Sequence, residues 1–182
     1  EVFKQAIKVF FIYSGITLVI FIILNLLSIR TFDSLNLAFS LISSGGFLPT
    51  NNLSSIIRND TQTIILSFLM LTSFFSIFFS YNLFFFKKKN INFLYEDLNL
   101  IIYLVIVLII FFLFFSFNQN FLNYFLSISS SMSNIGFTLD NSNTNLTFIY
   151  LILVIIGGSF FSTSSGLRFM KIYSLFIYSV NQ

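Results

Sequence analysis

Two short stretches, 90 residues apart, place small polar residues before a Gly-Phe pair in an otherwise apolar chain. They cover residues 43–47 and 133–137. Such stretches can bind a monovalent cation through backbone carbonyl and hydroxyl oxygens, which replace the hydration shell of the ion. Glycine allows this, because a side chain would block close approach or forbid the required dihedrals. The pattern predicts an ion filter made of Ser43, Ser44, Gly45, Gly46, Phe47, Ser133, Asn134, Ile135, Gly136 and Phe137.

A simpler interpretation of the two stretches stays open. Gly46 and Gly136 could end helices in loops outside a membrane, since glycine tolerates the positive φ that terminates a helix. If the stretches do bind an ion, the lack of acids favours a monovalent one, because Ca²⁺ and Mg²⁺ prefer carboxylate ligands. We therefore predict no cofactor, and no metal beyond a transported cation.

A third stretch, residues 157–166, interrupts the last apolar segment with glycines, serines and a threonine. Backbone at the depth of the membrane core is stable only where it is buried in protein or lines a water-filled cavity. Two local explanations remain for this stretch. The glycine pair could allow a close contact between helices, and the hydroxyl side chains could satisfy backbone groups that the interruption leaves free.

Composition places the chain in a bilayer. It is 57% hydrophobic and 8% charged, with a mean hydropathy of +0.94, whereas soluble domains carry about 25% charged residues. A net charge of +3 is too small for a nucleic-acid-binding surface. The sequence has no His and no Cys, so it lacks the usual general base and thiolate nucleophile. These features argue against an enzyme.

The filter and the third stretch require elements that position them. A charge-free segment of about 20 residues can cross the membrane, whereas one of about 10–14 residues is a re-entrant or buried piece. The order of long and short apolar segments is the same in residues 1–90 and 91–182, which we predict to be two repeats. The first repeat has spans at about 9–29 and 61–86 with a half-length helix at about 32–42, and the second has a span at about 98–117, a half-length helix at about 119–131 and a broken span at about 146–180.

Charge predicts the orientation. The side with more Lys and Arg faces the cytoplasm, and this side holds Lys4, Lys8, Lys87, Lys88, Lys89, Arg168 and Lys171. The N-terminus and Lys87–Lys89 are then cytoplasmic, and both half-length helices enter from outside. Their C-terminal ends carry a partial negative charge, which would attract a cation at the membrane centre.

Three motifs together resemble the TrkH/KtrB branch of the Trk/Ktr/HKT potassium transporters, whose chains contain four M1–pore-loop–M2 repeats. Phe32-Asp33-Ser34 with residues 43–47 is similar to the second repeat, Phe-Asp-Ala followed by Ser-Thr-Gly-Gly-Tyr/Phe. Residues 133–137 are similar to the Thr-Thr-Thr-Gly-Phe of the third repeat. The best match is residues 157–168, which are similar to Gly-Gly-Cys-x-Gly-Ser-Thr-Ala-Gly-Gly-Ile-Lys, the intramembrane loop that gates the pore below the filter.

The resemblance implies a fold and a function. The fold would be an all-α, multi-pass protein of the bacterial inner membrane with two M1–pore-loop–M2 repeats, and the function would be potassium uptake. The gating loop would comprise Gly157, Gly158, Ser159, Ser162, Thr163, Ser164 and Gly166. The resemblance also implies a cytoplasmic regulatory subunit that binds nucleotides.

The sequence departs from the family pattern in two ways. Phe161 and Ser165 replace glycines of the loop, and the first and fourth repeats are missing. Two filter strands cannot surround an ion, so the chain would be a fragment of a longer or split pore, half of a dimer, or a decayed remnant. The alternative function is a non-conducting membrane protein of the same fold, with a structural or assembly role.

Overall fold

The computed structural model of the chain describes residues 2–76, 91–115, 121–139 and 146–180. Apart from one pair of two-residue strands, its regular elements are helices, which confirms the predicted helical class. Strands β1 (Ile156–Gly157) and β2 (Leu167–Arg168) pair in parallel. The helices are α1 (Val2–Leu26), α2 (Thr31–Ser43), the short 3₁₀ helix η1 (Leu53–Ser55), α3 (Asp60–Leu71), α5 (Ile91–Phe115), α6 (Phe121–Met132), α7 (Thr147–Ile155) and α8 (Phe169–Val180).

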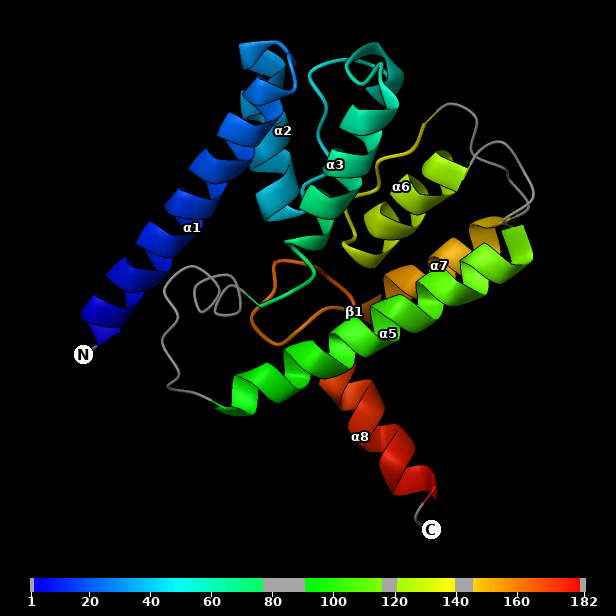
Figure 1. Cartoon of the computed structure of the whole chain (residues 1–182). Coiled ribbons are helices and arrows are strands. Elements are labelled where there is room, and N and C mark those ends of the chain that lie inside the picture. The colour runs from blue at the N-terminus through cyan, green and yellow to red at the C-terminus, as the bar shows by residue number, and fades with distance from the viewer. Residues whose placement is uncertain (1, 77–90, 116–120, 140–145, 181–182) are drawn as a thin grey trace.

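The helices pack as neighbours in two groups (Figure 1). In the first group α1 lies along α2, and in the second α6 packs on α7. The two groups meet where α3 packs on α6. The stacked rings of Phe111 and Tyr150, with centroids 6.2 Å apart, join α5 to α7. Helix α8 points away from the rest (Figure 1).

Each group of helices has its own buried core, and each core contains one aromatic side chain from a segment that follows a helix of the other group. The first core lies among α1, α2 and α3 and also takes up Leu126 of α6 and, after α6, Ile135 and Phe137. The second lies among α5, α6 and α7 and takes up Phe74, which follows α3. Both aromatic side chains are almost fully buried. The segments that follow α3 and α6 are therefore fixed by the opposite group of helices.

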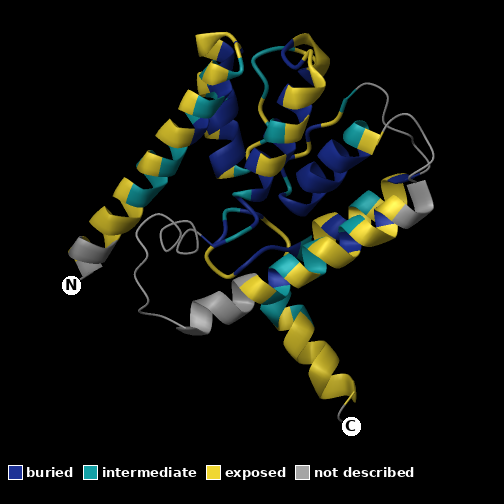
Figure 2. Cartoon of the chain, viewed as in Figure 1, coloured by how far each residue is buried: buried dark blue, intermediate teal, exposed yellow. Residues whose placement is uncertain are grey.

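Many large apolar side chains are exposed in the described structure, while many serines are buried. Figure 2 shows exposed residues along α1, α5 and α8 and buried residues along α6. On α1, Phe10 and Phe11 are exposed, whereas α6 buries Ser129 and Ser130. No residue of α8 is buried. By length and composition, Ala6–Leu26 is the one stretch among the described residues that could cross a membrane as a single helix, and Asp60–Leu71, Leu98–Phe112 and Phe169–Val180 are shorter apolar helices.

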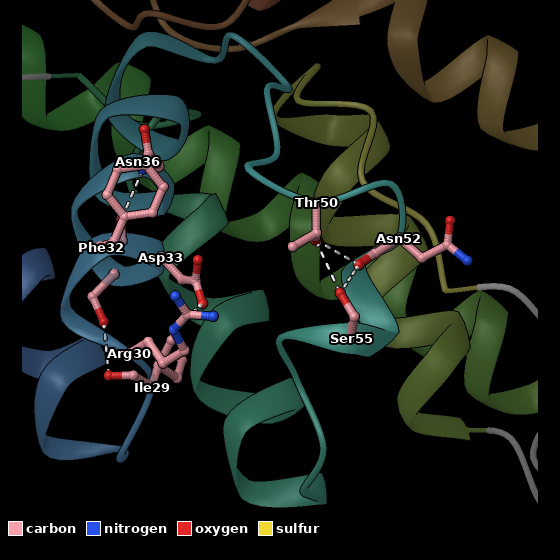
Figure 3. Close-up of polar contacts among 9 residues, drawn as sticks. Ile29, Arg30, Phe32, Asp33, Asn36, Thr50, Asn52 and Ser55 are labelled. Atoms are coloured by element: carbon pink, nitrogen blue, oxygen red, sulfur yellow. Dashed lines mark hydrogen bonds and ion pairs between the residues drawn. The ribbon is translucent and has the colours of Figure 1, made fainter.

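The short helix α2 begins beside an ion pair. Arg30 Nε lies 3.8 Å from Asp33 Oδ2, and the carboxylate is in the first turn, where the helix dipole favours negative charge. Ser34 Oγ donates to the Ile29 carbonyl oxygen over 3.3 Å. Figure 3 shows these contacts around the start of the helix. Since the Arg30 side chain is largely exposed, we expect the ion pair to contribute little stability.

The connection from α2 to α3 is held by side-chain hydrogen bonds. Ser55 Oγ donates to the Asn52 carbonyl over 2.7 Å and to Thr50 Oγ1 over 2.9 Å (Figure 3). At the start of α3, Gln62 Nε2 donates to the Leu27 carbonyl over 2.9 Å. This last bond fixes the start of α3 against the end of α1.

Helix α3 is shorter than the sequence predicted. The expected span covered residues 61–86, but the helix ends at Leu71 and is followed by a turn. Residues 77–86 of that span, and Lys87–Lys89, lie outside the described residues.

The reason for the early end is a run of hydroxyl residues. Thr72 Oγ1 donates to the Leu69 carbonyl over 2.7 Å, and Ser73 Oγ donates to the Met70 carbonyl over 2.8 Å. These bonds satisfy carbonyls that the next helical turn would otherwise use. The apolar residues on both sides hide this break in the sequence.

Other boundaries differ by less. Helices α1 and α5 start earlier than the apolar segments that predicted them, because hydrophobicity marks only the apolar part of a helix. Helix α6 starts at Phe121, and residues 119 and 120 of its predicted range lie outside the described residues. The broken segment is observed as α7, a loop and α8.

Candidate functional site

The first Gly-Phe stretch forms a turn at the C-terminal end of α2. Ser44 adopts the left-handed conformation, with φ of 51°. Its amide donates to the Leu41 carbonyl over 3.3 Å, and the amide of Gly45 donates to the Ser40 carbonyl over 2.9 Å. This pair of bonds is the Schellman arrangement that ends many helices. The Ser43 hydroxyl donates to the Phe39 carbonyl over 2.7 Å.

The second stretch repeats this geometry at the end of α6. Asn134 is left-handed, with φ of 58°. Its amide donates to the Ser131 carbonyl over 3.2 Å, and the amide of Ile135 donates to the Ser130 carbonyl over 3.0 Å. The Ser133 hydroxyl donates to the Ser129 carbonyl over 2.7 Å. Each donor and acceptor lies 90 residues after its counterpart in the first turn, so the sequence similarity corresponds to a shared backbone structure.

The two turns meet at Gly46. A Cβ atom on this residue would collide with the carbonyl oxygen of Ile135, and its φ is +70°. Gly136 has φ of +85°, but a Cβ there would meet no atom within 4 Å. Gly46 is therefore required by both conformation and close approach, whereas Gly136 is required by conformation alone.

The aromatic residues that follow the glycines differ in environment. Phe137 is 1% exposed and belongs to the first core, whereas Phe47 is 79% exposed. The hydroxyl groups differ as well, since Ser133 is buried and Ser43 is exposed. The repeat therefore holds for the backbone and for the hydrogen bonds of Ser43 and Ser133, but not for the burial of the side chains.

The 157–166 loop begins at strand β1 and ends at strand β2, which pair with each other (Figure 1). Gly157 and Gly166 stand at its two ends, where a Cβ on Gly157 would collide with the Ser165 carbonyl and Gly166 has φ of +89°. Inside the loop, Ser162 Oγ donates to the Ser159 carbonyl over 2.8 Å. Ser164 Oγ accepts from the Gly158 amide over 2.9 Å. Hydroxyl groups thus satisfy freed backbone groups, as one of the local explanations predicted.

The loop is seated on the broken end of α3. The Ser159 amide donates to the Phe74 carbonyl over 3.1 Å, and the Ser164 amide donates to the Ser73 carbonyl over 3.2 Å. A Cβ on Gly158 would collide with the same Phe74 carbonyl. Ser73 and Phe74 are not among the predicted site residues. The hydroxyl residues among residues 72–76 are the signal that could have revealed them.

The loop also contacts both turns. Ser44 Oγ lies 3.5 Å from Thr163 Oγ1, and Asn134 Nδ2 donates to the Ser165 carbonyl over 2.9 Å. A cavity of about 330 Å³ lies beside the second turn, with Asn134, Gly136 and Ser165 in its lining. Asn134 Oδ1 is buried there and has no hydrogen-bond partner among the described residues.

The structure thus brings the residues of the predicted filter and the predicted loop into one assembly. The two turns touch through Gly46 and Ile135, and the loop joins each turn through its left-handed residue. Among the described residues there is no group of three or more His, Cys, Asp or Glu side chains that could hold a metal ion.

Comparisons with known proteins identify the fold. No family model matches the sequence, and no curated protein matches it. The crystal structure of the potassium transporter TrkH from Vibrio parahaemolyticus matches the chain with a TM-score of 0.84 at 19% identity. The match covers 98% of this chain and 41% of that one. The resemblance to TrkH drawn from the sequence is therefore confirmed at the level of the fold, and this chain has the fold of about two fifths of that transporter.

Proposed function

We propose that this chain is part of a membrane pore that takes up potassium ions. The observation that carries the proposal is the contact between two turns of the same backbone geometry, at Gly46 and the Ile135 carbonyl. The fold of the chain is shared with part of a protein described as a potassium transporter.

The chemistry of the two turns fits a cation. Helices α2 and α6 end at these turns, and the C-terminal end of a helix carries a partial negative charge. Beyond each helix, residues 45–47 and 135–137 have no regular secondary structure, and we assign to their carbonyl oxygens the role of replacing water around an ion. The 157–166 loop joins both turns, and we assign it the role of a gate. No covalent chemistry is involved.

The proposed setting is the inner membrane of a bacterium. The exposed apolar side chains of α1, α5 and α8 would face lipid or the rest of the pore. In this setting residues 1–90 and 91–182 are two M1–pore-loop–M2 repeats, and the N-terminus and Lys87–Lys89 face the cytoplasm, as the positive-inside rule requires.

Two turns do not surround an ion, so the pore needs further protein. The chain spans 41% of the TrkH chain that it matches. Either further repeats or a second copy of this chain would complete the ring. A cytoplasmic nucleotide-binding subunit that regulates flux is part of the same proposal.

Growth of bacteria that lack their own potassium uptake systems tests the proposal. The chain is expressed alone and, separately, with its flanking coding sequence, at limiting potassium. In whichever of the two forms supports growth, Gly136→Val should abolish that growth, because valine in the left-handed region distorts the turn. Gly15→Val in α1 is the matched control, since a Cβ at Gly15 meets no atom within 4 Å.

The outcomes separate the possible forms of the pore. Growth with the extended form alone indicates a fragment of a larger pore, and growth with the chain alone indicates a dimer. If neither supports growth although both are present in the membrane, the chain is a non-conducting protein of this fold. Equal growth of Gly136→Val and Gly15→Val would remove Gly136 from the filter.

A further inference from the structure

The guanidinium group of Arg168 is held by oxygens of the 157–166 loop. Its Nη1 atom donates to the carbonyls of Ser159, Ser162 and Ser164 over 3.0, 3.4 and 3.1 Å. It also lies 3.1 Å from Ser162 Oγ. Nη1 carries two hydrogens, so four oxygens share them. Oxygens that outnumber the available hydrogens are arranged around the charge of the group and not only along its N–H bonds.

The charge of Arg168 is compensated by dipoles. Within the described part of the chain the one ion pair is Arg30–Asp33, in another part of the fold, and no carboxylate there pairs with Arg168. A cation inside a membrane protein is stable when it pairs with an acid or with backbone carbonyls. Here the carbonyls of the loop take the place of the acid.

We propose that the oxygens of Ser159, Ser162 and Ser164 form a cation site that the chain fills with its own Arg168, and that this tethered cation holds the loop in its closed conformation. The inference rests on the proposed function only for what closure does, namely to block flux. The cation site itself requires no pore.

The neighbouring contacts explain why the cation is needed. Without it, the carbonyl oxygens of Ser162 and Ser164 would lose their donor, whereas the Ser159 carbonyl would keep the Ser162 hydroxyl. A polar group without a partner is unfavourable away from water. Ser159 and Ser164 are also the residues whose amides seat the loop on Phe74 and Ser73. A change of loop conformation that separates these carbonyls would therefore also break the hydrogen bonds to Phe74 and Ser73. Arg168 is in this sense a positioning residue.

Ser159 provides a reporter for the state of the loop. The chain has no cysteine, so Ser159→Cys creates a single thiol. Ser159 is 0% exposed, and its hydroxyl has no hydrogen-bond partner among the described residues, so the change removes no contact. The rate at which a water-soluble thiol reagent modifies this cysteine in the full chain, in detergent micelles, reports how often the loop opens.

Arg168→Ala is expected to raise the modification rate by about tenfold or more, because the rate follows the open population. Lys171→Ala is the matched control, since it removes a positive charge from an exposed position of α8. The rate in this control should equal that of the reporter chain. An Arg168→Ala chain modified as slowly as the control would overturn the proposal.

Chemical rescue separates a cation site from a general packing role. Millimolar guanidinium chloride should restore slow modification in Arg168→Ala, because the free ion can occupy the vacated oxygens. Urea at the same concentration has a similar shape without the charge and should have no effect. Equal effects of guanidinium and urea would overturn the proposal.

Arg168→Lys keeps the test decisive if Arg168→Ala does not accumulate in folded form. Lysine is a compact point charge and lacks the planar fork of donors. We therefore expect a modification rate above that of the reporter chain and below that of a chain whose loop is fully open. A rate equal to that of the reporter chain would contradict the proposed fit of the guanidinium group. None of these measurements requires ion flux, so they remain informative whether or not the chain conducts.

Discussion

Asn134 donates from its side-chain amide to the carbonyl oxygen of Ser165 over 2.9 Å, and thereby joins the second Gly-Phe turn to the 157–166 loop. The equivalent residue of the first turn, Ser44, lies 3.5 Å from Thr163 of the same loop. Both residues are left-handed and lie 90 positions apart. The loop cannot move away without breaking both contacts, so its position is coupled to the two turns.

A crosslink between the first turn and the loop should form readily. Ser44→Cys with Thr163→Cys places two thiols where the hydroxyl oxygens are 3.5 Å apart, which small side-chain rotations can convert into a disulfide. Oxidation should give a faster-migrating band on a non-reducing gel and should stop any ion flux until a reductant is added. Ser43→Cys with Thr163→Cys is the control, because the Ser43 hydroxyl points to its own helix. Equal crosslinking of both pairs would contradict the observed contact.

The glycines of the two turns should differ in their tolerance of a side chain. Alanine in the left-handed region costs about 1–2 kcal/mol, so Gly136→Ala should lose that amount of unfolding free energy. Gly46→Ala should lose more, because its Cβ would also collide with the Ile135 carbonyl. Thermal unfolding in detergent, with Gly15→Ala as the reference, measures the order. If Gly46→Ala and Gly136→Ala melt at the same temperature, the two turns do not touch.

The two phenylalanines should contribute unequally to stability. Phe137→Ala removes an almost fully buried ring from the first core, and such a change costs about 3–5 kcal/mol. Phe47→Ala alters an exposed ring and should change stability by less than about 0.5 kcal/mol. Denaturant titration of both variants in the same detergent checks this difference. A comparable loss in both would mean that Phe47 packs against protein that completes the assembly.

Gly158→Ala should separate the loop from the end of α3. The added methyl group would collide with the Phe74 carbonyl and crowd the hydroxyls of Ser162 and Ser164. Amide hydrogen exchange at Ser159 and Ser164 should then become faster, because those amides donate to Phe74 and Ser73. Exchange within α1 serves as the internal control. Unchanged exchange at both amides would show that the loop is seated elsewhere.

The parts of the site that depend on local backbone requirements could be predicted from the sequence. Gly46, Gly136 and residues 157–166 stand out because glycine and small hydroxyl residues interrupt apolar segments, and each interruption is a turn or loop in the structure. The half-length helices also follow from segment length alone. These features depend on residues close together in the chain.

Features decided by distant contacts could not be predicted in this way. The break after Leu71 is stabilised partly by amides of a loop more than 80 residues away, which no local pattern reveals. Phe47 and Phe137 occupy matching sequence positions, yet only Phe137 joins the core formed with residues of α1, α2 and α3. Arg168 was interpreted as a signal of orientation, whereas its guanidinium group lies among the loop carbonyls.

The parallel pairing of Ile156 with Leu167 and of Gly157 with Arg168 has a mechanical consequence. The chain enters and leaves the loop in the same direction at adjacent points, so both ends of the loop are fixed at one place in the fold. Once its contacts with Ser73, Phe74 and the two turns are broken, the loop can pivot about that place while α7 and α8 keep their positions. Insertions within the loop would change its reach without shifting either helix.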